Sequence, residues 1–419
     1  MTQTVAETPE RRTKSPRRAL ITLCLTQITS WGVLFYAFPV LAGTIGADTG
    51  WSTAAITGAF SVGLAVSAAA GVPVGRLLDR HGPRPVMTVG SVLAVAAVAA
   101  IAWAPNPVWF LAAWALAGVA QACVFYKPAF AALTVWYGER RVRALTALTL
   151  VAGLSSTIFA PLTASLSEHL TWRETYLVLG LILAAITIPA HTIGLNRPWP
   201  GRATTIESRS SETAGPAPGA PPMKTVLRSV PFIVLATVMA LATFALFAAT
   251  FFLVPLLTGR GMDTTTAAWA LGLSGAGQLL GRIGYSTFAK HTSTTTRTAV
   301  ILALGALTIA ATTVISGPAV VVFAAVIALG AARGAFTLLE ATAVADRWGT
   351  RDFGLLYGIC SAPATIALAT APAAGAALAE RIGGYTPTFT VFIGLTLIAA
   401  LLSPLTRARP RETSPSQHR

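Results

Sequence analysis

The stretch "GRLLDRHGPRPV", residues 75–86, places three arginines and one aspartate between two long apolar runs. These runs cover about residues 52–78 and 84–104. A helix needs about 20 predominantly apolar residues to cross the hydrocarbon core of a bilayer, and both runs reach that length. The stretch therefore predicts a pair of transmembrane helices joined by a short charged loop.

Apolar runs of this length recur along nearly the whole chain of 419 residues. A composition of 54% hydrophobic and 11% charged residues, with a mean hydropathy of +0.67, excludes a soluble globular domain. We predict an all-α membrane protein with twelve transmembrane helices, the first of them an uncleaved helix and not a signal peptide. The predicted spans are 19–44, 52–78, 84–104, 107–137, 143–168, 172–195, 230–258, 264–290, 296–316, 318–347, 353–381 and 385–406.

The distribution of positive charge predicts the orientation of these helices. Lysine and arginine near the ends of spans favour the cytoplasmic side of a membrane. With both termini cytoplasmic, the inner segments hold 24 of the 30 Lys and Arg residues. The net charge of +15 then reflects topology and attraction to anionic lipid, so we expect a lipid bilayer as partner and no nucleic acid.

The residue patterns of an enzyme or a metalloprotein are missing from the sequence. The three cysteines all fall within predicted helices, without the paired spacing of a disulfide framework or a zinc site. No nucleophile and base pair, phosphate-binding loop or metal-ligand cluster can be recognised. We therefore expect no cofactor, no metal and no enzymatic activity.

The chain also contains an internal duplication. A Pro-, Gly-, Ser- and Thr-rich linker begins at residue 196 and leaves six predicted spans on either side. The proline of "IFAPLTASLSEHL" (158–170) aligns with that of "ATAPAAGAALAERI" (369–382) at an offset of 211 residues. Duplicated halves that rock about a central site are typical of secondary transporters. We predict two pseudo-symmetric six-helix bundles with the boundaries 1–18 (cytoplasmic tail), 19–195 (first bundle), 196–229 (cytoplasmic linker), 230–406 (second bundle) and 407–419 (cytoplasmic tail).

The charged stretch 75–86 resembles the G-x-L-x-D-R-x-G-R-[RK] loop of the major facilitator superfamily. Pro83 departs from that pattern, since the family usually has a basic residue there. The resemblance extends over about residues 19–406 and implies the major facilitator fold and alternating access. It also implies a conformational gate, a cytoplasmic latch made in one state and broken in the other. The implied gate residues are Gly75, Asp79, Arg80, Gly82 and Arg84.

Within this latch, Asp79 can sit at a helix N-terminus, where the dipole favours an anion. Arg80 and Arg84 can pair with an acid such as Glu139. The alternative is that these charges only fix the topology. The matching loop of the second half, "GYSTFAKHTS", has no acid, so we expect the second latch to be weak or absent.

Four charged residues fall inside predicted spans: Lys127, Arg282, Arg333 and Glu340. Placing a charge at the bilayer centre costs from about 3 to more than 10 kcal/mol. Lys127, in "CVFYKPAFAAL" (123–133), lies roughly 15 Å from the end of its helix, which is too deep for its side chain to reach the surface. It either faces an aqueous cavity or forms a structural ion pair with Glu340.

Arg282, in "GAGQLLGRIGY" (275–285), offers a planar fork that matches a carboxylate. The first and eighth spans are similar to those of the monocarboxylate transporter branch of the superfamily. That branch has a helix 8 arginine that binds the substrate carboxylate and an aspartate four residues ahead. The resemblance implies that Arg282 anchors the substrate, the alternative being a hydrogen-bonding role between helices. Gln278 replaces the aspartate, which is linked with proton coupling, so we assign coupling to Glu340.

Three buried cations against one anion favour a small-molecule substrate that is anionic. We predict a secondary active transporter of a small organic anion such as a monocarboxylate, coupled to protons, acting as a monomer in a prokaryotic plasma (inner) membrane. A proton-driven multidrug or natural-product exporter is the alternative, weakly favoured by "APLTA" (160–164), and a receptor or scaffold on the same fold is a third possibility. The predicted substrate-binding residues are Arg282, Lys127, Arg333, Tyr126, Tyr36 and Gln278, and Phe125, Trp31 and Tyr357 are further candidates for the cavity wall.

Overall fold

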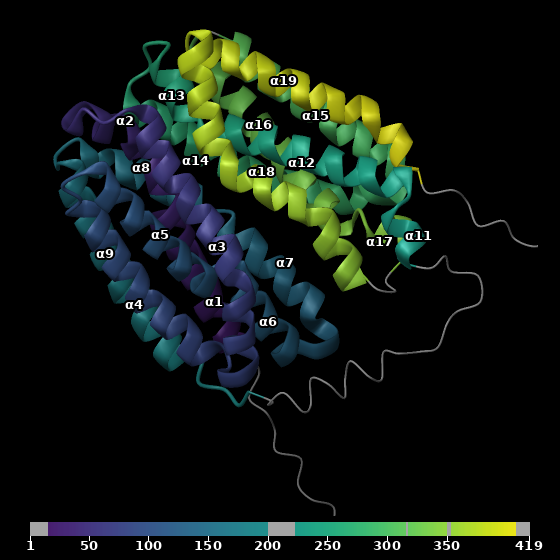
Figure 1. Ribbon diagram of the computed structural model, residues 1–419, viewed down its shortest axis with the longest axis horizontal. Coiled ribbons are helices and arrows are strands. Elements are labelled where there is room, and N and C mark those ends of the chain that lie inside the picture. Colours follow the sequence, from purple (N-terminus) through teal and green to yellow (C-terminus); the bar gives the residue numbers. More distant parts are fainter. Residues whose placement is uncertain (1–15, 200–222, 316, 350–352, 408–419) are drawn as a thin grey trace, which may run out of the picture.

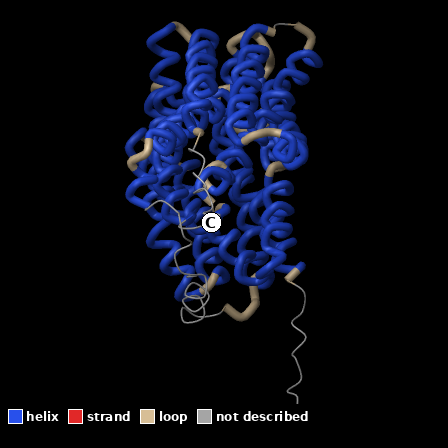
Figure 2. Tube along the Cα trace, turned by 90° about the vertical axis from the view of Figure 1, so that its right-hand side faces the viewer, coloured by secondary structure: helices blue, strands red, loops and turns tan. Residues whose placement is uncertain are grey.

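The protein is built from helices packed side by side. The computed structural model describes residues 16–199, 223–315, 317–349 and 353–407, and every regular element in these ranges is helical (Figure 2). Figure 1 shows two groups of helices, α1–α9 in purple and blue and α11–α19 in green and yellow. We call them the N-terminal half and the C-terminal half.

The N-terminal half crosses between its two ends six times. Three crossings are interrupted: one by a π-helical turn, one by a break between α5 and α6, and one by a turn between α7 and α8. Its elements are α1 (Arg17–Trp31), η1 (Gly32–Tyr36), α2 (Ala37–Thr49), α3 (Thr53–His81), α4 (Pro83–Ala102), α5 (Pro107–Val124), α6 (Tyr126–Tyr137), η2 (Gly138–Arg140), α7 (Arg141–Ala152), α8 (Ser155–Ser167), α9 (Trp172–Pro189) and η3 (Ala190–Gly194).

The C-terminal half repeats this arrangement with more continuous helices. Its elements are α11 (Met223–Leu227), α12 (Val230–Phe251), α13 (Leu253–Thr258), α14 (Thr264–His291), α15 (Thr294–Val314), α16 (Ala319–Thr342), α17 (Ala345–Trp348), α18 (Phe353–Ile382), α19 (Tyr385–Leu402) and η4 (Ser403–Thr406).

The observed helices follow the twelve predicted spans. Within the described residues, eleven helical segments are long and apolar enough to cross a membrane. The remaining predicted span, 264–290, is the helix α14 of 28 residues. Its glycines, serines, threonines, Gln278 and Arg282 lower its hydropathy, yet it packs between α8 and α16. The polar span is therefore an internal helix of the bundle.

Contacts between the halves gather at one end of the molecule. We call the end where η3 stops and α11 begins the linker end, and the other the far end. Across the halves, α3 packs on α18 and α8 packs on α14. Ser61 accepts a hydrogen bond from the Ala373 amide at 3.0 Å, and Thr157 donates to the Gly272 carbonyl at 2.7 Å. The halves are joined toward the far end, and Figure 1 shows their helices diverging toward the linker end.

Aromatic rings reinforce the junction of the two halves. The ring of Phe251 from the C-terminal half lies 5.9 Å from the ring of Phe38 and 5.3 Å from that of Phe60. Phe35 and Phe247 make a further contact at 5.5 Å. Aromatic pairs at such distances stabilise by about 0.5–1.5 kcal/mol beyond the burial of their area. The junction is therefore an apolar seal.

The linker end of the C-terminal half carries an ion pair. Arg297 at the start of α15 pairs with Asp346 of α17 and is 6% exposed. The adjacent Arg347 donates to the Thr298 hydroxyl and to the carbonyl and hydroxyl oxygens of Thr406. The second latch was expected to be weak or absent because its loop has no acid. The acid that orders this end comes instead from α17, outside that loop.

Candidate functional site

The two arginines of the predicted site stand on helices that approach each other unusually closely. Arg282 belongs to α14 and Arg333 to α16. A Cβ atom on Gly281 would run into the backbone of Ala331, and one on Gly334 would run into the backbone of Gln278. Small residues at such positions let two helices pack backbone to backbone. The spacing of the two guanidinium groups is therefore set by rigid elements.

Tyr36 stands on an irregular segment of the N-terminal half. The π-turn η1 ends at Tyr36, and the Ala37 amide donates to the Gly32 carbonyl, five residues earlier. The side chain of Gln121, from α5, donates to the Leu34 carbonyl at 3.1 Å. Single π-turns inside α-helices are frequent at functional sites. This one changes the direction of the side chains that follow it along the helix.

Tyr126 stands on a second irregular segment, where α5 ends and α6 begins. Phe125 between them is extended, with φ −77° and ψ −164°. Pro128 has no amide hydrogen to donate to the carbonyl four residues earlier, which belongs to Val124. The side chain of Gln27 donates to that carbonyl at 2.6 Å instead. The Val124 carbonyl at the break is therefore still hydrogen-bonded, and Tyr126 lies at the start of a new helix.

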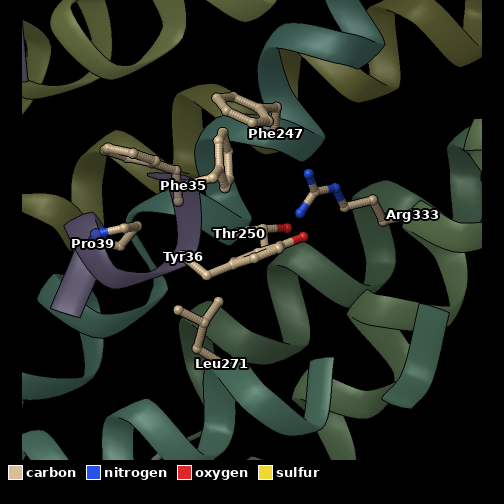
Figure 3. A pocket seen from close by; sticks show the side chains of 8 residues that line it. Phe35, Tyr36, Pro39, Phe247, Thr250, Leu271 and Arg333 are labelled. Atoms are coloured by element: carbon tan, nitrogen blue, oxygen red, sulfur yellow. The ribbon is translucent and has the colours of Figure 1, made fainter. Parts of the chain in front are cut away.

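These four side chains meet where the two halves adjoin. Figure 3 shows the Tyr36 ring reaching toward the Arg333 guanidinium, with Thr250 beside them. The Arg333 guanidinium also lies 5.4 Å from the ring centre of Phe247. Tyr126 lies close enough to Arg282 for their polar groups to interact, as Tyr36 does to Arg333. The two arginines are also close enough for their charges to repel each other. A small, tightly lined pocket at this place is bounded by Phe35, Tyr36, Pro39, Phe247, Thr250, Phe251, Leu271 and Arg333.

Arg282 and Gln278 each have an unpaired hydrogen-bond donor. The Arg282 guanidinium donates through Nη1 to the Thr149 carbonyl of α7 in the other half. Its Nε is buried with no acceptor among the described residues, and the same holds for Nε2 of Gln278, which is 4% exposed. Buried donors are normally paired, so each unpaired donor requires an explanation. An acceptor-rich ligand would supply one.

Lys127 and Glu340 lie elsewhere. The Lys127 side chain is exposed and lies over Gly71 of α3, where a Cβ would come within 2.9 Å of its Nζ. Glu340 lines a separate pocket in the C-terminal half together with Tyr357 and Cys360. The described residues include no ion pair between Lys127 and Glu340. The structure therefore brings together Tyr36, Tyr126, Arg282 and Arg333, with Gln278 one turn away, and leaves the other two apart.

The gate residues lie at the linker end of α3 and α4. Asp79 is exposed in the last turn of α3, so it lies at the C-terminal end of its own helix, and its placement at the N-terminus of another helix stays a prediction. Gly82 separates α3 from α4 with a φ of 79°, a value that favours glycine. Gly75 and Arg80 precede it on α3, Gly75 with open space around its Cα and Arg80 exposed.

Arg84 is the gate residue with described hydrogen bonds from its side chain. Its Nε donates to the Thr192 carbonyl at 2.8 Å, and its Nη1 donates to the Asn196 side chain at 3.1 Å. Both partners belong to the N-terminal half. The predicted partner Glu139 has a side chain outside the described residues. The latch therefore stays a prediction.

Sequence reasoning missed the residues that hold the two irregular segments. Gln27 and Gln121 were not singled out, although each is an uncharged polar residue inside a predicted span. Both are fully buried. Gln27 of α1 donates to the backbone at the break between α5 and α6, and Gln121 of α5 donates to the backbone of the π-turn η1. A buried amide in an apolar helix needs a partner, which is the signal that would have identified them.

Comparisons with known proteins agree with this architecture. The family model described as Major Facilitator Superfamily matches residues 23–328. Monocarboxylate transporter 13 of Bos taurus is 27% identical over 87% of this chain and 81% of its own length. Monocarboxylate transporter 11 of Homo sapiens is 36% identical over 36% of this chain and 31% of its own length.

Two further matches are a shorter one and one that rests on structure alone. The uncharacterized MFS-type transporter YcxA of Bacillus subtilis is 27% identical over 32% of this chain, and the match spans only 33% of that relative. The crystal structure of a D-xylose-proton symporter covers 95% of this chain and 99% of its own, with a TM-score of 0.74 and 11% identity. That likeness confirms the predicted fold. With its family model matched over most of its length, the chain belongs to the major facilitator superfamily and is a multi-pass membrane transporter, not an enzyme.

Proposed function

We propose that this transporter moves a small organic anion in symport with a proton. The observation that carries the proposal is the meeting of Arg282 and Arg333 with Tyr36 and Tyr126 between the two halves. Guanidinium groups bind carboxylates through paired, charge-assisted hydrogen bonds. The relatives named monocarboxylate transporters support the same class of substrate.

The test is uptake into proteoliposomes that contain the purified protein. We expect labelled anions to accumulate when the inside is alkaline, and Arg282→Gln to abolish this uptake. Arg173→Gln is a matched control, because Arg173 bonds to carbonyls at the far end of the N-terminal half. Flux of a dye or antibiotic that persists in Arg282→Gln would support the exporter, and anion uptake that survives the same substitution would refute the anchor.

Glu340 is the proposed proton carrier. It lines a different pocket from Arg333, together with the polar residues Tyr357, Cys360 and Ser361. A carboxyl with no cation beside it can exchange a proton without releasing the anion. We expect Glu340→Gln to retain exchange of anion for anion and to lose accumulation driven by a pH gradient. Retention of pH-driven accumulation would rule this assignment out.

The proposal includes an orientation, with the linker end facing the cytoplasm of a prokaryotic cell. The support is the excess of Lys and Arg in the segments at that end. The structure then corresponds to an inward-facing state of a monomer. A cysteine placed in the 196–229 linker is expected to react with a membrane-impermeant maleimide only after cells are broken, and labelling in intact cells would reverse the orientation.

A further inference from the structure

The central group of side chains holds two permanent positive charges without a matching acid. Arg282 and Arg333 lie close enough to act on each other. Among the described residues, the one ion pair joins Arg297 to Asp346 at the linker end and involves neither of these arginines. Glu340 belongs to a different pocket. Like charges at membrane depth are unfavourable unless something compensates them, and an anion from outside the protein is one such partner.

The unpaired donors indicate which acceptor groups a bound ligand would need. Arg282 has one guanidinium nitrogen engaged with Thr149, while its Nε has no acceptor in the described structure. Gln278, one turn earlier on the same face of α14, has an unpaired and almost fully buried Nε2. These donors, with the Tyr126 hydroxyl, form one set. The Tyr36 hydroxyl and the Arg333 guanidinium, which lie close together in Figure 3, form a second set.

The two donor sets draw their arginines from separate elements of the C-terminal half. Their arginines stand on different helices, α14 and α16, whose backbones meet at Gly281 and Gly334. Any approach of one guanidinium to the other is opposed by their charge and by the rigid packing of the helices. A ligand with two acceptor groups can satisfy both sets at once.

We propose that the substrate is a small dicarboxylate dianion. One carboxylate is held by Arg282, Tyr126 and Gln278, and the other by Arg333 and Tyr36. A dianion neutralises both guanidinium groups, whereas a monoanion leaves one unpaired. This inference rests on the proposed anion transport and names its substrate class, and it makes Arg333 the residue that selects for the second charge.

The experiment is counterflow in proteoliposomes at pH 7.5 with four labelled probes. Malonate and succinate are the dianions, and acetate and lactate are monoanions of similar composition. For the unaltered protein we expect exchange of malonate or succinate to exceed that of either monoanion at least tenfold. Arg333→Gln is expected to reverse this preference, Arg333→Lys to keep it in weakened form, and Arg282→Gln to abolish exchange of all four.

The outcomes separate this inference from the proposed function. Exchange of monoanions without exchange of dianions, unchanged by Arg333→Gln, overturns the dianion assignment and leaves anion transport standing. No exchange of any probe, together with no thermal stabilisation of the unaltered protein by malonate or lactate, overturns both. Size-exclusion profiles and melting temperatures of the variants show whether a lost activity reflects misfolding. An Arg333→Gln protein that is folded, is stabilised by lactate and is not stabilised by malonate supports the inference.

Discussion

Replacing Gly281 with alanine tests whether the close packing of α14 on α16 positions the two arginines. A Cβ there would lie 2.7 Å from the carbonyl carbon of Ala331 and 3.0 Å from its Cα. Ordinary contact begins at 3.4 Å, so the carbonyl carbon alone requires a shift of about 0.7 Å, and the Ala331 carbonyl oxygen, which lies nearer still, requires more. The opposing atoms belong to a helix backbone and cannot turn aside as a flexible side chain would. Overpacking of this kind typically costs about 1–3 kcal/mol of stability.

The larger effect is expected on transport, because Arg282 is the next residue along α14. A misplacement of about 1 Å within a binding constellation can cost about 100-fold in activity. We therefore expect the KM for anion uptake to rise about tenfold or more in Gly281→Ala. The measurements are uptake into proteoliposomes over a range of anion concentrations and the melting temperature of the purified protein in detergent.

A matched control lies on the same helix. Gly284 has nothing within 4 Å of an added Cβ, so Gly284→Ala is expected to keep the original KM. Its melting temperature should stay the same or rise, since alanine favours helix over glycine by about 1 kcal/mol. If Gly281→Ala and Gly284→Ala proved indistinguishable in KM and melting temperature, the packing of these helices would not set the geometry of the arginines.

Three further substitutions probe the seal, the irregular segments and the linker end. Phe251→Ala removes the ring that contacts both partners in the N-terminal half, and is expected to increase the population open at the far end, measured by spin-label distances. Gln121→Leu leaves the Leu34 carbonyl without its side-chain donor and is expected to cost about 1–3 kcal/mol, measured by thermal unfolding. Asp346→Asn removes the charged partner of Arg297 and is expected to cost about 1.5–3 kcal/mol, read as a lower melting temperature.

Conservative variants provide the controls for these three. Phe251→Leu keeps apolar bulk and should retain most of the closed population, so an equal effect of leucine and alanine would argue against the ring contacts. For Gln121→Leu, an unchanged melting temperature would show that the Leu34 carbonyl finds another donor. Asp346→Glu keeps the charge and is expected to lose less stability than Asp346→Asn, and the reverse order would contradict the ion pair as the cause.

The spans were predictable because length and hydropathy are properties of the local sequence. The helix breaks were not, since they depend on distant side chains. Pro128 marks a weakened helix, but the position of the break follows from Gln27 of α1 bonding to the Val124 carbonyl. The π-turn before Tyr36 is likewise supported by Gln121, 87 residues away in the chain. Such pairings cannot be derived from helical periodicity.

The site was predictable in its residue types and only partly in its geometry. Depth along a helix can be derived from sequence position, whereas the direction of a side chain around the axis depends on packing. Lys127 directly follows Tyr126, yet one residue turns about 100° around a helix, and Lys127 lies over Gly71 instead. Glu340 and Arg333 share a helix face but lie about 10 Å apart along it, and they line different pockets.

The two halves contribute unequal parts to the central pocket. The cations stand on helices whose backbones touch through glycine, whereas the phenols stand on a π-turn and on a helix break. Under the proposed function, selection for an anionic substrate resides in the rigid pair of helices, and the fit to the shape of the substrate resides in segments that tolerate adjustment. Diversification of such carriers is then expected to begin at positions 36 and 126, with the arginines inherited unchanged.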